Sequence, residues 1–135
     1  MSEFGFGGNL RWMAVLACNS LQDQSCNSMA NAGVLPIPNN LHLLCGTTTV
    51  SYMSDNIGEL WATKMLGGFF TRAETVERAW YDGGRQAYQD ATNIPSGSIV
   101  VFRMAGSDNC FSDTLQSYAG GTSGNITSTT NIVWP

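Results

Sequence analysis

The stretch LRWMAVLAC, residues 10–18, is the strongest indication of the fold. Its apolar run over residues 10–17 is typical of a short strand that is buried on both faces of a parallel sheet. Residues 41–50 form a second run of this kind, with three β-branched threonines in succession. A third run follows at residues 98–104. We therefore expect a sheet that contains these three strands.

Two helical patterns lie between the second and third predicted strands. Ser54 or Asp55 is expected to cap a helix that ends at Gly67. The segment Thr71–Glu74 matches a capping box, in which a hydroxyl and a carboxylate satisfy orphan amides reciprocally. Apolar side chains then recur at helical spacing, which predicts an amphipathic helix over residues 72–91.

Three further features complete the predicted element order. The pair Gly83-Gly84 lies inside the second helix, where glycine is unfavourable, and indicates close packing against another backbone or a kink. A short helix is expected over residues 25–32, before two prolines. Residues 126–134 are expected to form an edge strand.

Strands that alternate with helices predict an α/β domain, specifically a three-layer αβα sandwich with a mainly parallel sheet. The length of 135 residues fits one domain, residues 1–135. Residues 1–9 are expected to be a lead-in loop. Residues 111–135 form a Gly/Ser/Thr-rich tail that contains the edge strand.

Composition and charge exclude several classes of partner. Only 12% of the residues are charged, the net charge is −4 and Lys64 is the single lysine, so we expect no nucleic-acid partner. The sequence has no apolar run of the roughly 20 residues that cross a bilayer, so no membrane partner is expected. The four irregularly spaced cysteines favour reduced thiols and a cytoplasmic location, with secretion as the alternative.

No cofactor and no metal site are expected. The chain has one histidine and no C-x-x-C pair, and no GK[ST] motif follows a strand. Ten of the sixteen charged residues lie between Asp55 and Asp90, whereas residues 24–54 carry none. The uncharged polar loop before the second strand lies next to Cys18 in the predicted fold, and a ligand or partner is expected there.

Cys18 is the candidate catalytic residue because it directly follows a buried strand. Reactive groups in open α/β sheets gather at the carboxyl ends of strands, and a buried structural cysteine is the alternative interpretation. Asn19, Ser20 and Thr49, in the loops after the first two strands, are the candidate binding residues. The only histidine, His42, begins the second strand. If the two strands are parallel, it lies about 20 Å from Cys18, too far for a dyad.

The segments at residues 11–19 (RWMAVLACN) and 40–46 (NLHLLCG), with the helix that carries Val76 and Trp80, resemble the caspase-like superfamily of gingipain and separase-type domains. They are most similar to an uncharacterised bacterial domain family near it. The resemblance implies that Cys18 corresponds to the nucleophile. It also implies a partner histidine upstream, where this chain has none. The chain is then either the C-terminal half of such a domain or a diverged module.

These observations favour a caspase-like module without enzymatic activity, which acts in binding or in self-assembly. An unpaired sheet edge would let it form a homo-oligomer. One alternative is a cysteine hydrolase that uses Cys18 as nucleophile, with a base from another chain or from a carboxylate. A second alternative is a binder of a small molecule or peptide, which uses the loops after Cys18 and Thr49.

Overall fold

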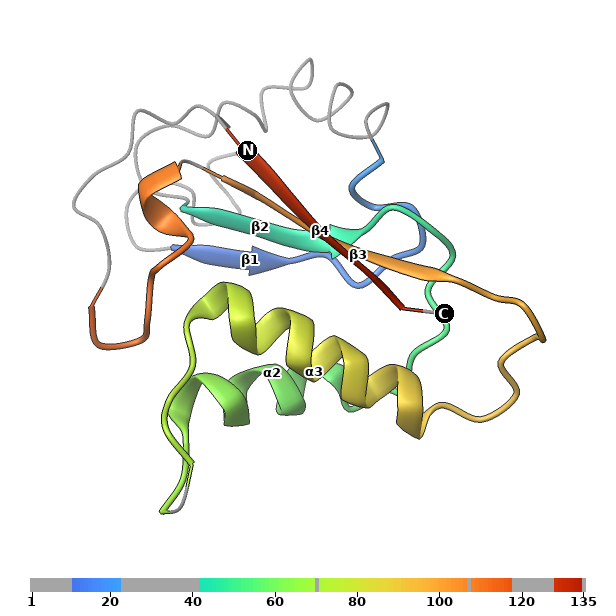
Figure 1. Cartoon of the computed structure of the whole chain (residues 1–135), viewed down its shortest axis with the longest axis horizontal. Coiled ribbons are helices and arrows are strands. Elements are labelled where there is room, and N and C mark those ends of the chain that lie inside the picture. Colours follow the sequence, from blue (N-terminus) through green and yellow to red (C-terminus); the bar gives the residue numbers. More distant parts are fainter. Residues whose placement is uncertain (1–10, 23–41, 70, 107, 118–127, 135) are drawn as a thin grey trace, which may run out of the picture.

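The computed structural model describes residues 11–22, 42–69, 71–106, 108–117 and 128–134. Four strands form one sheet in the order β1 (Trp12–Ala14), β2 (Leu43–Thr47), β3 (Val100–Gly106) and β4 (Ser128–Trp134) (Figure 1). β1 and β2 are parallel, whereas β2–β3 and β3–β4 are antiparallel. The predicted α/β class is confirmed, but the prediction of a mainly parallel sheet is wrong.

The direction of β3 follows from the two helices that precede it. α2 (Ile57–Leu66) runs back along the sheet after β2, and α3 (Val76–Asp90) runs forward again beside it (Figure 1). Two antiparallel helices return the chain to the end of the sheet at which β2 finished. β3 must therefore run against β2, whereas a single crossover helix would have made it parallel.

Both described helices cover the same face of the sheet, so the described residues form two layers and the predicted three-layer sandwich is not seen in them (Figure 1). The opposite face of β2 is covered in part by the loop after β1. A Cβ on Gly46 would lie 2.4 Å from Ser20 Oγ and 2.8 Å from Leu21 Cγ, and Leu21 is fully buried. β2 is thus buried on both faces, as expected, although its neighbour β3 is antiparallel.

The helix boundaries differ from the predicted caps. α2 begins after Asn56, which makes no side-chain cap bond, and ends as expected at Gly67, where φ is +69°. α3 begins at Val76 because Thr75 is its N-cap and accepts a hydrogen bond from Arg78 N at 3.1 Å. The capping box predicted for residues 71–74 is therefore wrong, and the cap lies four residues later.

Tertiary hydrogen bonds explain why residues 71–75 stay outside the helix. Glu74 N donates to Lys64 O at 3.1 Å, and Val76 N donates to Asp113 O at 2.8 Å. These backbone groups are thus bound to α2 and to the segment after β3. Because the acceptors belong to other segments of the chain, these hydrogen bonds cannot be inferred from the local sequence.

The glycine pair of α3 allows close packing, as predicted. A Cβ on Gly83 would lie 3.2 Å from the backbone N of Trp61 in α2. A Cβ on Gly84 would lie only 2.3 Å from the ring of Phe102 in β3. Gly83 therefore lets α2 approach α3 closely, and Gly84 leaves room for the ring of Phe102.

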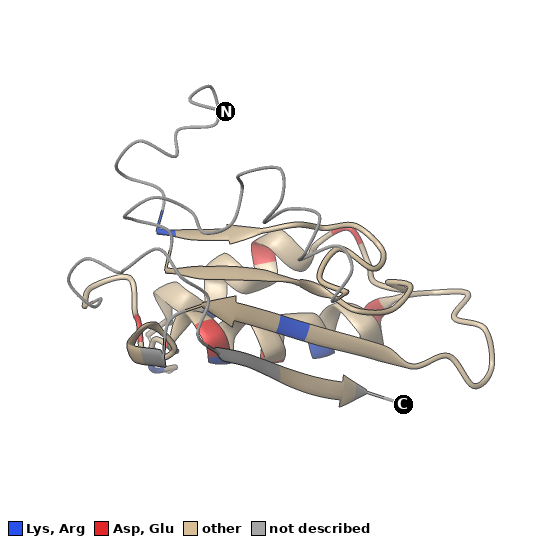
Figure 2. Ribbon diagram, turned by 90° about the horizontal axis from the view of Figure 1, so that it is seen from above, with Lys and Arg blue, Asp and Glu red and all other residues tan. Residues whose placement is uncertain are grey.

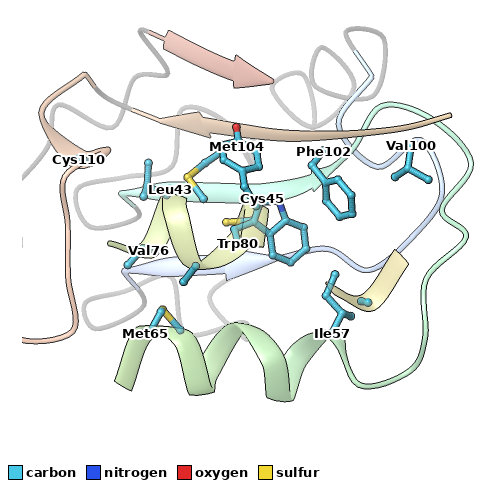
Figure 3. Close-up of a cluster of buried hydrophobic side chains, with 13 residues drawn as sticks. Leu43, Cys45, Ile57, Met65, Val76, Trp80, Val100, Phe102, Met104 and Cys110 are labelled. Carbon is cyan, nitrogen blue, oxygen red and sulfur yellow. The ribbon is translucent and has the colours of Figure 1, made fainter. Parts of the chain in front are cut away.

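The core lies between the two helices and the sheet (Figure 3). Trp80 is its largest fully buried side chain and meets the rings of Trp61 and Phe102 edge-on, at centroid distances of 5.6 and 5.9 Å. A buried tryptophan removes about 150–250 Å² from water, which stabilises the fold by roughly 4–6 kcal/mol before entropy is counted. This contact joins α2, α3 and β3 into one unit.

The charged residues are concentrated on the helices, as the sequence indicates (Figure 2). Of the four strands, only β3 carries a charged residue, Arg103. Its guanidinium donates to Asn131 Oδ1 in β4 and to Leu21 O in the loop after β1, both at 2.9 Å. Arg103 therefore joins these segments across the sheet.

The remaining predictions concern strand lengths and undescribed segments. β1, β2 and β4 lie inside the predicted runs at 10–17, 41–50 and 126–134, and β4 is an edge strand as expected. β3 lies two residues later than predicted at both ends. The predicted lead-in loop at residues 1–9 and the predicted helix at 25–32 lie outside the described residues. Within the described part of the chain, no helix is long and apolar enough to cross a membrane.

Candidate functional site

Cys18 is exposed and lies in a turn beyond the carboxyl end of β1. The next residue, Asn19, has a φ of +57°, which is uncommon outside glycine and gives the chain a sharp reversal. Asn19 N donates to Thr49 O at 2.9 Å, so this turn is bound to the loop after β2. Ser51 N, in that second loop, donates to Cys18 Sγ at 3.3 Å. The two loops together hold the sulfur at the molecular surface.

A pocket of about 330 Å³ adjoins this thiol. It lies between the loop after β1, the loop after β2 and the first residue of α2. Apolar side chains dominate its wall, and Asp55 is the one charged residue among those that line it. The complete lining is Leu16, Ala17, Cys18, Ser51, Met53, Ser54, Asp55 and Ile57. The pocket therefore combines a thiol, a carboxylate and an apolar surface.

The three candidate binding residues lie beside Cys18 but do not line this pocket. Ser20 Oγ donates to Val15 O at 3.0 Å and accepts from Thr47 N at 3.2 Å. Thr49 Oγ1 accepts from Val101 N at 2.9 Å, and Asn19 Oδ1 accepts from Gln22 Nε2 at 3.0 Å. These contacts build the loops that position the thiol. A direct binding role for the three side chains remains a prediction.

The other two described cysteines, Cys45 in β2 and Cys110 after β3, are free thiols buried in the core. Burial raises the pKa of the Cys45 thiol well above its ordinary value, and the charge of Glu77 adds to this effect. A thiol in such surroundings stays protonated and unreactive. Of the described cysteines, Cys18 alone is accessible.

His42 lies at the opposite end of the sheet, as predicted from a parallel β1–β2 pair. Its backbone N donates to Arg11 O at 2.6 Å beside the start of β1, whereas Cys18 follows the end of β1. The structure therefore does not bring His42 and Cys18 together. A Cys18–His42 dyad within one chain is excluded by the register of the sheet.

The imidazole of His42 instead takes part in a buried polar cluster. Its Nδ1 donates to Asp113 Oδ2 at 2.5 Å, and both side chains are at most 1% exposed. Trp12 Nε1 donates to the same carboxylate oxygen at 2.9 Å, and Arg11 Nη1 lies 3.5 Å from His42 Nε2. Cys110 Sγ completes a group in which nitrogen, sulfur and carboxylate ligand atoms lie within 4.8 Å of one another.

Sequence reasoning did not find this cluster. His42 and Asp113 are 71 positions apart, and Asp113 reads in the sequence as a turn residue of a polar tail. Only the antiparallel pairing of β2 with β3 brings residues 110–113 beside the start of β2, since Gly106 pairs with Leu43. No spacing motif could have indicated it.

The class defined by this geometry is a mixed α/β domain with an exposed thiol at a pocket and a separate buried His–Asp–Cys cluster. The chain belongs to a family described as a domain of unknown function (DUF6345), whose model matches residues 1–134. The comparisons with curated proteins and with solved structures found no match.

Proposed function

We propose that this domain is a non-enzymatic binding module, related to the caspase-like proteins, whose ligand site is the pocket beside Cys18. The observation that carries the proposal is the exposed thiol at the rim of a pocket of about 330 Å³. The only histidine of the sequence is bonded to Asp113 at the other end of the sheet. Cys18 thus has no imidazole from its own chain, which supports binding over peptidase activity.

The lining of the pocket indicates the kind of ligand. Four apolar side chains offer contact area, and Asp55 offers one negative charge at the same wall. A small molecule or short peptide with an apolar group next to a cationic or hydrogen-bond-donating group would complement both. The exposed side chain of Leu16, 55% accessible, extends the apolar surface beyond the rim.

Covalent fragment capture tests this proposal. The protein carries Cys26→Ser, so that Cys18 is its only accessible thiol among Cys18, Cys45 and Cys110, and is equilibrated with disulfide fragments under mild reduction. We expect capture at Cys18 to be selective for apolar fragments with a cationic group. Asp55→Asn should reduce that selectivity without reducing iodoacetamide labelling. Capture that only follows the intrinsic reactivity of each fragment, as with a free thiol in solution, would contradict a binding pocket.

A cysteine hydrolase is the second candidate, because Asp55 is a carboxylate in the same pocket as the thiol. Turnover of fluorogenic ester and peptide substrates, measured for the wild type, Cys18→Ala and Asp55→Asn, separates the two functions. The binding proposal expects no turnover above the Cys18→Ala background. Turnover that is lost in both variants would favour the hydrolase.

Self-association is proposed as a further property of the module. β4 is an edge strand of the described sheet and, over Ser128–Trp134, contains no charged residue and no proline that would hinder pairing. We expect a concentration-dependent dimer in light scattering coupled to size exclusion. Val133→Lys, at a side chain of this strand that is 57% exposed, should shift the dimer to monomer. A wild-type chain that stays monomeric up to millimolar concentration would exclude pairing at this edge.

A further inference from the structure

The buried cluster at the start of β2 contains three side chains of different ligand chemistry. His42 offers an imidazole nitrogen, Cys110 a sulfur and Asp113 a carboxylate oxygen, and these atoms lie within 4.8 Å of one another. The residues come from two segments with firm backbone anchors. His42 N donates to Arg11 O at 2.6 Å, and Asp113 N donates to Cys110 O at 3.0 Å. These backbone hydrogen bonds therefore hold the segments that carry the ligand atoms in place.

Burial distinguishes this group from an ordinary surface cluster of polar residues. His42, Cys110 and Asp113 are each no more than 1% exposed. A buried carboxylate is costly unless a positive charge or several donors compensate it. A divalent ion bound by one carboxylate, one thiolate and one neutral imidazole makes a centre with zero net charge, which is suited to a water-excluded site.

We propose that His42, Cys110 and Asp113 bind a divalent transition-metal ion, with zinc preferred. Nitrogen, sulfur and carboxylate oxygen are the ligand atoms of tetrahedral zinc sites, at about 2.0–2.3 Å from the ion. Ligand atoms around such an ion lie roughly 3–4 Å apart. The His42 and Asp113 ligand atoms, hydrogen-bonded at 2.5 Å, must therefore move apart by about 0.5–1.5 Å, and Cys110 Sγ must approach them.

Binding of the metal ion is balanced in protons and charge. The ion replaces the hydrogen bond from His42 Nδ1 to Asp113, and the neutral imidazole then carries its proton on Nε2. The thiol proton of Cys110 passes to solvent as the metal–sulfur bond forms. Trp12 Nε1, which donates to Asp113 at 2.9 Å, keeps the carboxylate oriented as an outer-sphere partner.

Arg11 provides a test that distinguishes metal binding from a purely structural role of the cluster. Its Nη1 lies 3.5 Å from His42 Nε2, and its half-buried side chain can turn toward solvent when Nε2 becomes a donor. The positive guanidinium opposes a second cation nearby. Arg11→Gln should therefore tighten metal binding severalfold, an effect that a purely structural His42–Asp113 pair does not predict.

Cobalt titration tests the site, since Co²⁺ substitutes for zinc and absorbs in the near ultraviolet when a thiolate binds it. The full chain with Cys18→Ser and Cys26→Ser retains Cys45 and Cys110 as its only thiols. We expect a saturable thiolate-to-cobalt band at one ion per chain, removed by an equivalent of Zn²⁺. Cys110→Ala should abolish the band, and the matched control Cys45→Ala, another buried cysteine, should retain it.

A second variant keeps the proposal testable if Cys110→Ala does not fold. Asp113→Asn keeps the shape and one hydrogen-bond acceptor, and should weaken Co²⁺ binding at least tenfold with unchanged far-ultraviolet circular dichroism. Absence of the band in the parent protein at millimolar Co²⁺ overturns the proposal. A band that survives Cys110→Ala, or equal affinity in Asp113→Asn, also overturns it. None of these results bears on the pocket at Cys18.

Discussion

Replacing Gly84 by alanine tests how closely α3 lies on the sheet. The new methyl group would be built 2.3 Å from Phe102 Cε1 and 2.7 Å from Cζ. Ordinary van der Waals contact begins at 3.4 Å, so the ring must move by roughly 1 Å. Phe102 is fully buried and its ring meets that of Trp80 edge-on, so a shift of the phenylalanine ring also disturbs this contact.

The expected free-energy change has two opposing parts. Alanine favours the helical backbone by about 1 kcal/mol over glycine. Overpacking a closed core costs about 1–3 kcal/mol, and the upper end applies because α3 and β3 are both held by the rest of the core. Gly84→Ala should therefore lower the free energy of unfolding by about 1–2 kcal/mol. Gly58→Ala is the matched control in α2. A Cβ there meets nothing within 4 Å, so the same change should stabilise by about 0.5–1 kcal/mol.

Urea unfolding followed by tryptophan fluorescence measures both variants, and thermal midpoints should differ in the same order by several degrees. The double variant Gly84→Ala/Phe102→Leu should be more stable than the sum of its single changes predicts, because leucine removes the ring edge that the methyl group meets. If Gly84→Ala is as stable as the wild type or more so, the close approach of α3 to β3 is refuted.

Three further predictions concern single polar groups. Burial raises the pKa of the Glu74 carboxyl, a neighbouring carboxylate adds to the rise, and Oε2 has no hydrogen-bond partner within the described chain. The folded chain then binds more protons than the unfolded one, so stability falls as the pH rises from the ordinary to the raised pKa. Glu74→Gln should remove this dependence and stabilise by a few tenths of a kcal/mol at pH 7, as thermal midpoints across pH will show. Thr75→Ala should cost about 1 kcal/mol in urea unfolding as the loss of a helix cap, whereas Thr71→Ala should cost less than half of that. Asp113→Ala should cost about 2–3 kcal/mol in the metal-free protein, because it removes the buried carboxylate that accepts from His42 Nδ1 and Trp12 Nε1, and a variant within 1 kcal/mol of the wild type would contradict the pair.

Much of the fold could be predicted from local patterns. The apolar runs indicate where β1, β2 and β3 lie, but only β2 is buried along its whole length, whereas β1 is half-buried throughout. Gly67 indicates the end of α2 because a left-handed residue closes a helix. The direction of β3 could not be predicted. It depends on how many helices cross the sheet before the chain returns, which is a property of packing and not of any window of residues.

The candidate site, like the fold, could be predicted only in part. Cys18 could be chosen from the sequence because a polar turn after a buried strand must emerge at the sheet edge, and the structure leaves it exposed there. Its separation from His42 also followed from two parallel strands of known order. The pocket wall from Asp55 and Ile57 required the position of α2 relative to that edge, and no local pattern carries that information.

The sequence by itself determined where the strands lie, where the charge lies and which thiol follows a strand. These are properties of neighbouring residues, set by hydrophobicity and backbone preference over a few positions. Tertiary structure alone decided that Asp113 reaches His42 across 71 positions and that Gly84 admits the ring of Phe102. Such contacts depend on strand register and helix packing. Both are set by how segments far apart in the sequence fill a close-packed core, which no short stretch of sequence specifies.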